Sequence, residues 1–254
     1  MLMLIGYGLS SFKGISLKGL ETARKCDKVY LETYTSPIKV NLKEVEEILG
    51  RKVEIVTRED LENGERIIRE SISKRVAILT PGDPLIATTH ISLLLEAEKH
   101  GVKTKTIHAA SIYTVAISEA GLHIYKFGRV GTLTVPNHII PFSIYEVIVE
   151  NMRRGLHTLL LLQQDPSAGK FLSVKDALNL LVRMSAMKND GMITKDTVAV
   201  VLSGLETEFE VKLAGRIKRL MEALSHSSSQ PAVIIIPGRL HFMEKETLKR
   251  IWVD

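Results

Sequence analysis

Residues 75–84 read RVAILTPGDP, a short apolar run that leads into two prolines flanking a glycine and an aspartate. The run Arg75–Thr80 is typical of a strand buried in a parallel sheet. The prolines and the glycine fix a rigid, non-helical loop directly after it. Because ligands of open α/β sheets bind at the carboxyl ends of the strands, we expect Thr80–His90 to form one wall of a small-molecule site.

The loop after this strand has two interpretations. Asp83, held between a glycine and a proline, can accept hydrogen bonds from the hydroxyls or the amine of a ligand. Thr88 and Thr89 can cap the following helix and leave amide donors facing the site. A tight turn in which Asp83 is only a helix-capping acceptor fits equally well. A second small-residue turn, His108–Ile112 (HAASI), follows the next expected strand, and its spacing slightly favours a compact strand-to-helix turn over ligand contact.

Strand and helix signals alternate on both sides of this loop. In the first half, strands are expected at Met1–Ile5, Lys28–Glu32, Lys52–Val56, Arg75–Thr80 and Val102–His108. Helices are expected from Ser16 to about Lys25, after a cap at Asn41, and at Glu59–Lys74, His90–His100 and Ser111–Glu119. This rhythm predicts a parallel sheet covered by helices.

The region Gly121–Gly131 breaks the rhythm and is the expected link between two domains, 1–121 and 122–254. After it, strands are expected at Thr132–Val135, Thr158–Leu162, Thr197–Leu202 and Ala232–Ile236, with Glu208–Lys212 as a hairpin partner. Helices are expected at Tyr145–Arg153, Val174–Met187 and Ala214–Leu224, and Ser225–Gln230 reads as a polar loop. The fold class is therefore two α/β domains.

Composition restricts the class of protein. The chain has 254 residues, a formal net charge of +5 and one cysteine, Cys26, which suits a reducing cytosol and reads as helix-end packing. Its longest apolar runs are far shorter than the roughly 20 residues of a membrane span, and no secretory leader is recognisable. Basic and acidic residues are interspersed and aromatic residues are scarce, so neither a membrane nor direct nucleic-acid binding is expected.

Several catalytic motifs are missing from the sequence. Gly6-Tyr7-Gly8 lacks the third glycine of a dinucleotide-binding fingerprint, and no phosphate-binding P-loop is present. No hydrolase nucleophile elbow, HExxH helix or CxxC pair occurs either. The sequence therefore predicts an enzyme or a binding module without a metal centre.

Four segments give the chain a specific likeness. They are LTPGDPLIATTH (Leu79–His90), GLHIYKFG (Gly121–Gly128), GLHTLLLL (Gly155–Leu162) and IIPGRLHFME (Ile235–Glu244). The PGDP element resembles the tetrapyrrole methylase-like methyltransferases as a whole. The ATTH extension and GLHIYKFG resemble the diphthine synthase branch of that superfamily.

This resemblance implies a fold and an activity. Two α/β domains would hold S-adenosyl-L-methionine in the cleft between them, with S-adenosyl-L-homocysteine as the product, in a cytoplasmic homodimer. The reaction would be the successive methylation, up to trimethylation, of an amino group on translation elongation factor 2. That amino group belongs to a 3-amino-3-carboxypropyl-histidine, and the reaction is a step of diphthamide biosynthesis. Whether the carboxylate is methylated too is left open.

The resemblance also implies cofactor-binding residues. Their shared feature is a position at or near the end of a strand: Leu9, Asp83, Ile86, Ser111, Ile112, Leu162, Leu205 and Ala232. Three places in the second half depart from the family pattern. Gln163 and Gln164 precede Asp165, where an acidic residue usually comes first; Ser203-Gly204-Leu205 replaces an Ala-Arg-Ala; and Ala232 replaces a histidine. Contacts made by the backbone would survive these changes.

The expected chemistry needs little from the protein beyond alignment, because a sulfonium methyl group is already activated. The attacking amine must be neutral, and the sequence assigns no catalytic base. An aromatic lining would stabilise a quaternary ammonium product, with Tyr7, Tyr34, Tyr113 and Tyr125 as candidates that fit packing equally well. Two alternatives remain at this point: a methyltransferase of the same superfamily acting on a small, tetrapyrrole-type molecule, and a non-catalytic module that binds S-adenosylmethionine.

Overall fold

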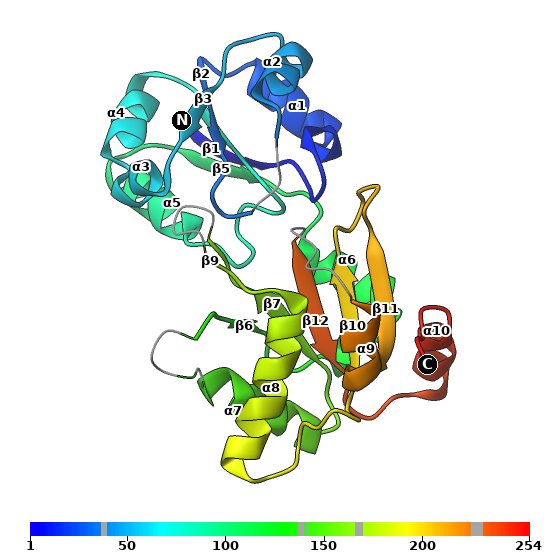
Figure 1. Cartoon of the computed structure of the whole chain (residues 1–254). Coiled ribbons are helices and arrows are strands. Elements are labelled where there is room, and N and C mark those ends of the chain that lie inside the picture. The colour runs from blue at the N-terminus through cyan, green and yellow to red at the C-terminus, as the bar shows by residue number, and fades with distance from the viewer. Residues whose placement is uncertain (37–39, 137–139, 141, 166–169, 225–230) are drawn as a thin grey trace. The chain divides into compact units, whose positions relative to one another are not determined.

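The chain folds into two compact units, Met1–Ile112 and Tyr113–Asp254 (Figure 1). The computed structural model describes residues 1–36, 40–136, 140, 142–165, 170–224 and 231–254. The sequence placed the division after residue 121, whereas the compact units divide after Ile112. Helix α6 (Ile112–Ala120) accounts for the difference, because Glu119 near its end forms an ion pair with Lys212 of the second unit.

The first unit is built on a five-stranded parallel sheet, as the alternation of elements predicted. Its strands are β1 (Leu2–Gly6), β2 (Lys28–Glu32), β3 (Glu54–Val56), β4 (Val76–Thr80) and β5 (Thr104–Ile107). Their spatial order is β3-β2-β4-β1-β5, and every pairing is parallel. The carboxyl ends of β4, β1 and β5 therefore lie side by side.

Helices cover both faces of this sheet. They are α1 (Leu17–Arg24), α2 (Leu42–Leu49), α3 (Arg58–Asn63), α4 (Glu65–Ser73) and α5 (His90–Lys99), with a 3₁₀ turn, η1, at Phe12–Gly14. Strand β1 shows why two layers are needed, because its side chains alternate between faces. Met3 and Ile5 pack into one core cluster, and Leu2 and Leu4 pack into another.

Local capping explains most of the helix boundaries. The Ser16 hydroxyl accepts a hydrogen bond from the Gly19 amide at 3.0 Å and begins α1, and Asn41 begins α2 in the same way. The prediction of a single helix at Glu59–Lys74 is wrong, because the structure has two helices there, α3 and α4. Gly64 adopts φ +67°, a left-handed conformation that ends α3 and starts α4 in a new direction.

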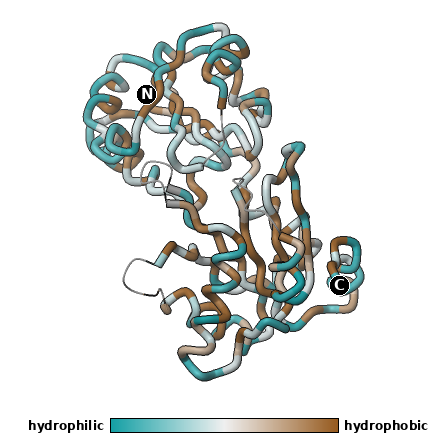
Figure 2. The backbone as a smooth tube through the Cα atoms, in the orientation of Figure 1, coloured by the Kyte–Doolittle hydropathy of each residue, from teal (hydrophilic) through white to brown (hydrophobic). Residues whose placement is uncertain are grey.

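The second unit contains a mixed sheet. Its strands are β6 (Gly131–Leu133), β7 (Thr158–Leu162), β10 (Val198–Ser203), β11 (Val211–Arg216) and β12 (Ala232–Ile236), in the order β11-β10-β12-β7-β6. Only β6 and β7 pair in parallel; β12 runs antiparallel to both β7 and β10. β8 (Gln164–Asp165) and β9 (Lys170–Phe171) pair antiparallel in a separate two-stranded sheet. In Figure 2 the central strands of this sheet are predominantly hydrophobic.

The helices of this unit are α6, α7 (Phe142–Arg153), α8 (Val174–Lys188), α9 (Ile217–Ala223) and α10 (Phe242–Lys249), with a 3₁₀ turn, η2, at Ile124–Lys126. Residues of α7, α8 and α9 share one hydrophobic core with the sheet. Figure 1 shows α8 in front of the sheet and α6 behind it. The described residues contain no helix that is both long and apolar enough to span a membrane.

Three predictions in the second half need correction. The hairpin partner of β10 is Val211–Arg216 rather than Glu208–Lys212, because Gly204 and Glu206 adopt positive φ in a longer connecting loop. The following helix accordingly begins at Ile217. The segment Gly121–Gly131 is part of the second unit and not a link between domains. The predicted polar loop at 225–230 lies outside the described residues.

The carboxyl end of β1 has no room for a side chain. A Cβ atom on Gly6 would stand 2.4 Å from the carbonyl oxygen of Gly82 and 2.9 Å from the Ala109 Cβ. We expect Gly6→Ala to lower the free energy of unfolding by about 2–3 kcal/mol, because the backbone of the loop after β4 would have to move. Gly50→Ala is the comparison: that site is open but has φ +70°, so only about 1 kcal/mol of backbone strain is expected. Urea denaturation of both variants measures the difference, and equal losses would contradict the packing argument.

Candidate functional site

The candidate site of the first unit lies where β1, β4 and β5 end. The loops after β1 and β4 are joined through two glycines: the Gly82 amide donates to the Gly8 carbonyl at 2.7 Å, and the Gly8 amide donates to the Gly82 carbonyl at 3.4 Å. Both have positive φ, +81° for Gly8 and +63° for Gly82. The two loops thus form one continuous backbone surface at the carboxyl edge of the sheet.

Asp83 joins this surface to the loop after β5. Its Oδ1 accepts a hydrogen bond from the Leu85 amide at 3.0 Å, which closes a tight turn. Its Oδ2 lies 2.8 Å from Nδ1 of His108 and accepts from the Ala109 amide at 3.3 Å. The carboxylate is 7 % exposed. Asp83 therefore closes a turn and also bridges two strand ends, and it does not cap helix α5.

The other residues proposed for this edge differ in exposure. Leu9 follows the β1 turn and is half-buried, Ser111 is buried, and Ile112 is the first residue of α6. Ile86 is 44 % exposed, so its side chain is available to a ligand. The structure thus brings Leu9, Asp83 and Ser111 to neighbouring strand ends.

The two threonines after the loop do not cap the next helix through their side chains. The Thr88 hydroxyl donates instead to the Pro84 carbonyl at 2.6 Å, and Thr89 stands at the N-cap of α5 without a side-chain cap bond. Nδ1 of His90 also lies 3.0 Å from the Pro84 carbonyl. Two side chains therefore converge on one carbonyl and hold the loop in place.

Two observations at this edge fit a polar ligand. The hydroxyl of Thr80, at the end of β4, is buried and has no hydrogen-bond partner among the described residues, although buried polar groups are usually paired. A Cβ atom on Gly82 would meet no atom within 4 Å, so the space beside this glycine is open. An unpaired hydroxyl next to an open backbone surface suits a ligand with hydrogen-bonding groups.

The second unit also gathers its proposed residues at one edge of its sheet. Ala232 begins β12 opposite Ser203, the last residue of β10, and Val233 pairs with Leu161 of β7. Leu162 and Leu205 are each 5 % exposed and Ala232 is 8 % exposed. These residues therefore expose little surface to a ligand in this structure.

Gln163, one of the departures from the family pattern, has a structural role. Its side-chain oxygen accepts a hydrogen bond from the Val135 amide at 2.9 Å, and its own amide donates to the Leu133 carbonyl at 2.9 Å. The residue therefore continues the pairing of β6 with β7 past the end of both strands.

The four tyrosines considered as an aromatic lining have different environments. Tyr7 is buried against Phe12, and burial, with a smaller effect of Glu32, raises the pKa of its hydroxyl. The hydroxyl of Tyr34 lies 3.5 Å from Nε2 of His90. Tyr125 is 95 % exposed, and Tyr113 lies in α6. Only Tyr7 and Tyr34 belong to the first unit.

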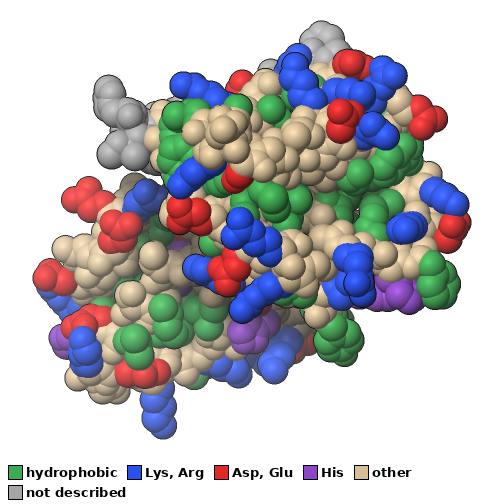
Figure 3. Space-filling model, turned by 90° about the horizontal axis from the view of Figure 1, so that it is seen from below, with side chains coloured by type: hydrophobic (Ala, Val, Ile, Leu, Met, Phe, Trp, Pro, Cys, Tyr) green, Lys and Arg blue, Asp and Glu red, His purple; other side chains and the backbone are tan. Residues whose placement is uncertain are grey.

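The surface charge gives no strong electrostatic pattern. On the face shown in Figure 3, Lys and Arg side chains are interspersed with Asp and Glu. Exposed ion pairs occur among the described residues, for example Lys99 with Glu96 at 2.8 Å. That face lacks the broad basic patch typical of a nucleic-acid interface.

Comparisons with known proteins show the family of this chain. The family model of the tetrapyrrole (corrin/porphyrin) methylases matches residues 1–220. A protein of Methanocaldococcus jannaschii named diphthine synthase is 39 % identical, with 98 % of each chain covered. A crystal structure of a diphthine synthase has a TM-score of 0.86 at 36 % identity and covers 99 % of this chain and 95 % of its own. A putative diphthine synthase from Entamoeba histolytica has a TM-score of 0.89 at 28 % identity, covering 100 % of this chain and 99 % of its own.

The chain belongs to the diphthine synthase family, within the tetrapyrrole methylases.

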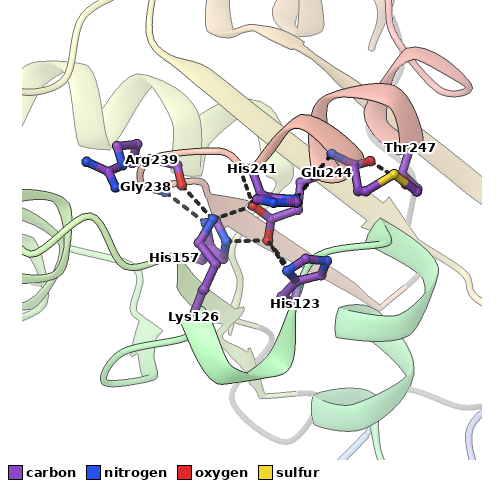
Figure 4. Close-up of polar contacts among 9 residues, drawn as sticks. His123, Lys126, His157, Gly238, Arg239, His241, Glu244 and Thr247 are labelled. Atoms are coloured by element: carbon purple, nitrogen blue, oxygen red, sulfur yellow. Dashed lines mark hydrogen bonds and ion pairs between the residues drawn. The ribbon is translucent and has the colours of Figure 1, made fainter.

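Three of the four diphthine synthase-like segments meet at a buried carboxylate that sequence reasoning did not single out (Figure 4). Glu244 has no exposed surface. Its Oε1 accepts from the His123 amide at 2.9 Å and lies 3.0 Å from Nε2 of His157; its Oε2 accepts from the His241 amide at 2.7 Å and from the Lys126 ammonium. These partners come from segments 121–128, 155–162 and 235–244. Three of the four segments that carry the resemblance thus form a buried polar cluster in the second unit, which we call the lock: Glu244 with His123, Lys126, His157 and His241.

The contacts within the lock and its burial shift the pKa values of Glu244 and His157. Burial opposes the charge on Glu244, but the hydrogen bonds from Lys126, His241, His123 and His157 together lower its pKa from 4.5 to about 2. Nδ1 of His157 accepts from the Gly238 amide at 3.0 Å, so its proton stands on Nε2 and points to Glu244. Burial lowers the pKa of this imidazole, against the opposing effect of Glu244. The lock at neutral pH is therefore an ion pair of Glu244 with Lys126 plus a neutral His157.

The lock predicts a pH dependence of stability. Because the pKa of Glu244 is depressed in the folded state, its contribution is complete above about pH 4.5 and is lost as the pH falls toward 2. We expect Glu244→Gln to cost about 3 kcal/mol of unfolding free energy at pH 7, since Lys126 and three N–H donors lose a charged acceptor. The difference from the unsubstituted protein should shrink on acidification below pH 4.5.

Urea denaturation between pH 7 and pH 3 measures this effect. Glu246→Gln is the matched control, because Glu246 lies on the same helix, is exposed and pairs only with Lys249 among the described residues. It should change stability by less than about 0.5 kcal/mol. A Glu244→Gln variant as stable as this control would show that the lock contributes nothing to the fold.

Proposed function

We propose that this protein is an S-adenosyl-L-methionine-dependent methyltransferase of diphthamide biosynthesis. Its substrate is the 3-amino-3-carboxypropyl-histidine of translation elongation factor 2, whose amino group it methylates in successive steps. The observation that carries this proposal is the likeness to diphthine synthases over 98 % of the chain at 39 % identity. The carboxyl edge of the first sheet, with its rigid loops and unpaired Thr80 hydroxyl, supports it independently.

The residues that we propose for donor binding lie at or near strand ends in each of the two units. In the first unit, Asp83 offers a fixed carboxylate, Leu9, Ser111 and Ile112 offer backbone groups at turns, and Ile86 offers an exposed apolar side chain. In the second unit, Leu162, Leu205 and Ala232 complete the proposed set, and each has little exposed surface. When bound, the donor supplies a methyl group on a positively charged sulfur, so the protein's main task is alignment.

The proposal also includes the protein's setting. We place it in the cytoplasm, where elongation factor 2 is the protein partner, and we expect it to act as a homodimer. The single cysteine supports a reducing compartment: Cys26 is buried, and its thiol donates to the Thr22 carbonyl at the end of α1.

The proposed activity is tested by mass. The protein is incubated with S-adenosylmethionine and with elongation factor 2 that carries the unmethylated amino-carboxypropyl group. We expect the factor to gain mass in steps of one methyl group, because each transfer adds one carbon to the same amine. The same factor with an unmodified histidine is the control and should gain nothing. A factor that carries the group and remains unchanged in mass would contradict the proposal.

Asp83 is tested by its effect on donor binding. We expect Asp83→Ala to weaken binding of S-adenosylmethionine by about 10-fold or more, because a charged acceptor is lost and the loops after β4 and β5 are no longer joined. Isothermal titration calorimetry measures the affinity. Asp27→Ala is the matched control: Asp27 also accepts a backbone N–H, that of Arg75 at 2.7 Å, but it lies at the opposite edge of the same sheet. Equal affinities in the two variants would remove Asp83 from the proposed site.

A further inference from the structure

His108, which contacts Asp83, differs in solvent exposure from His90, which lies in the same unit. His108 directly follows β5, and its side chain is 67 % exposed while the carboxylate that holds it is 7 % exposed. His90, in contrast, is 3 % exposed, and its two ring nitrogens lie near the Pro84 carbonyl and the Tyr34 hydroxyl. His108 is thus a solvent-accessible imidazole at the end of a parallel strand.

The carboxylate determines which ring nitrogen carries the proton. Oδ2 of Asp83 is only an acceptor when ionised, so Nδ1 of His108 donates across the 2.8 Å contact. Nε2 then holds a lone pair, and no hydrogen bond to it is found in the part of the chain that the structure describes. Asp83 is itself fixed by the amides of Leu85 and Ala109, at 3.0 and 3.3 Å. A buried, oriented carboxylate that holds an exposed imidazole is the arrangement of a general base and its orienting partner.

We propose that His108 is the general base of the methyl transfer, with Asp83 as its positioning residue. This inference rests on the proposed function, which requires a neutral amine for every transfer. Nε2 of His108 takes a proton from the substrate ammonium and leaves an amine with a free lone pair. That lone pair forms the new nitrogen–carbon bond as the carbon–sulfur bond breaks, and the electrons of the broken bond stay on sulfur. His108 then passes its proton to solvent and is ready for the next transfer.

The position of His108 beside Asp83 suits both the uptake of a proton and its release to solvent. The imidazolium formed after proton transfer stands beside the Asp83 carboxylate, which stabilises the positive charge. Exposure of the ring allows the proton to leave between successive methylations. The same carboxylate belongs to the loop that we propose holds the donor, so one side chain connects donor binding with proton removal.

The test separates the base from a merely structural histidine. In His108→Asn the side-chain amide can still donate to Asp83 from near the position of Nδ1, but the basic nitrogen is gone. We expect the single-turnover rate of the first methylation to fall by about 100-fold or more. Donor affinity by calorimetry and the KM for the factor should stay within about twofold of the unsubstituted protein. Thermal melting shows whether the variant is folded.

A second variant and a control complete the experiment. His108→Ala leaves a space at an exposed position, and added imidazole should restore part of its lost rate. His100→Asn is the matched control: His100 is also exposed, and among the described residues its ring nitrogen Nδ1 contacts Glu96, at the carbonyl 2.9 Å away and at the carboxylate 3.7 Å away. Its rate should equal that of the unsubstituted protein.

The outcomes distinguish the two proposals. If the unsubstituted protein adds no methyl group to the factor, the proposed function itself fails. If it does and His108→Asn reacts at the same rate, only the general base is overturned. A variant that loses donor affinity while keeping its rate at saturation would make His108 a binding residue and would equally overturn the inference. So would a His108→Ala variant whose rate imidazole does not restore.

Discussion

The close approach of backbone at the ends of β1 and β4 is the constraint on which the first unit's site depends. Gly6 has no room for a Cβ atom, and Gly8 and Gly82 exchange hydrogen bonds while both adopt positive φ. Only glycine meets these demands at low cost. The two loops are fixed to each other. The turn at Asp83 therefore lies beside the end of β5, where the Asp83 carboxylate contacts His108 and Ala109. The geometry of the edge therefore follows from packing of the main chain and not from any one functional side chain.

The sequence predicted what is local. Three predicted strands match the structure residue for residue: Lys28–Glu32, Thr158–Leu162 and Ala232–Ile236. Short apolar runs between turn residues are a clear strand signal in the sequence. The break at Gly64 was missed because helical periodicity continues across it, and only the φ of the glycine ends the helix. Strand β11 was misplaced because the length of the loop before it depends on the conformation of Gly204 and Glu206, which periodicity does not report.

The site was predictable only in part, because sequence patterns report local elements and not which distant residues meet. The prolines, the glycine and the place after a buried strand predict that the loop 80–90 forms a ligand wall, and this stays a prediction. Its partner His108 lies 25 residues away and becomes a neighbour only through the strand order β4-β1-β5. The contacts of Glu244 with His157, Lys126 and His123 join residues 87 to 121 positions apart, so that only its capping contact with His241, three residues away, has a spacing that a sequence pattern could report. The likeness to diphthine synthases had marked the three segments that meet there, but it could not show that they meet.

The pairs His157–Glu244 and His108–Asp83 show how burial gives the same kind of contact two different roles. His157 and Glu244 both have no exposed side-chain surface, and both ring nitrogens of His157 are engaged. His108 and Asp83 share the same kind of hydrogen bond, but the imidazole is exposed and one nitrogen is left unengaged among the described residues. Burial on both sides makes the first pair a structural contact. Burial of the acid alone leaves the second pair with a fixed orientation and an accessible lone pair, which is what proton removal from an amine requires.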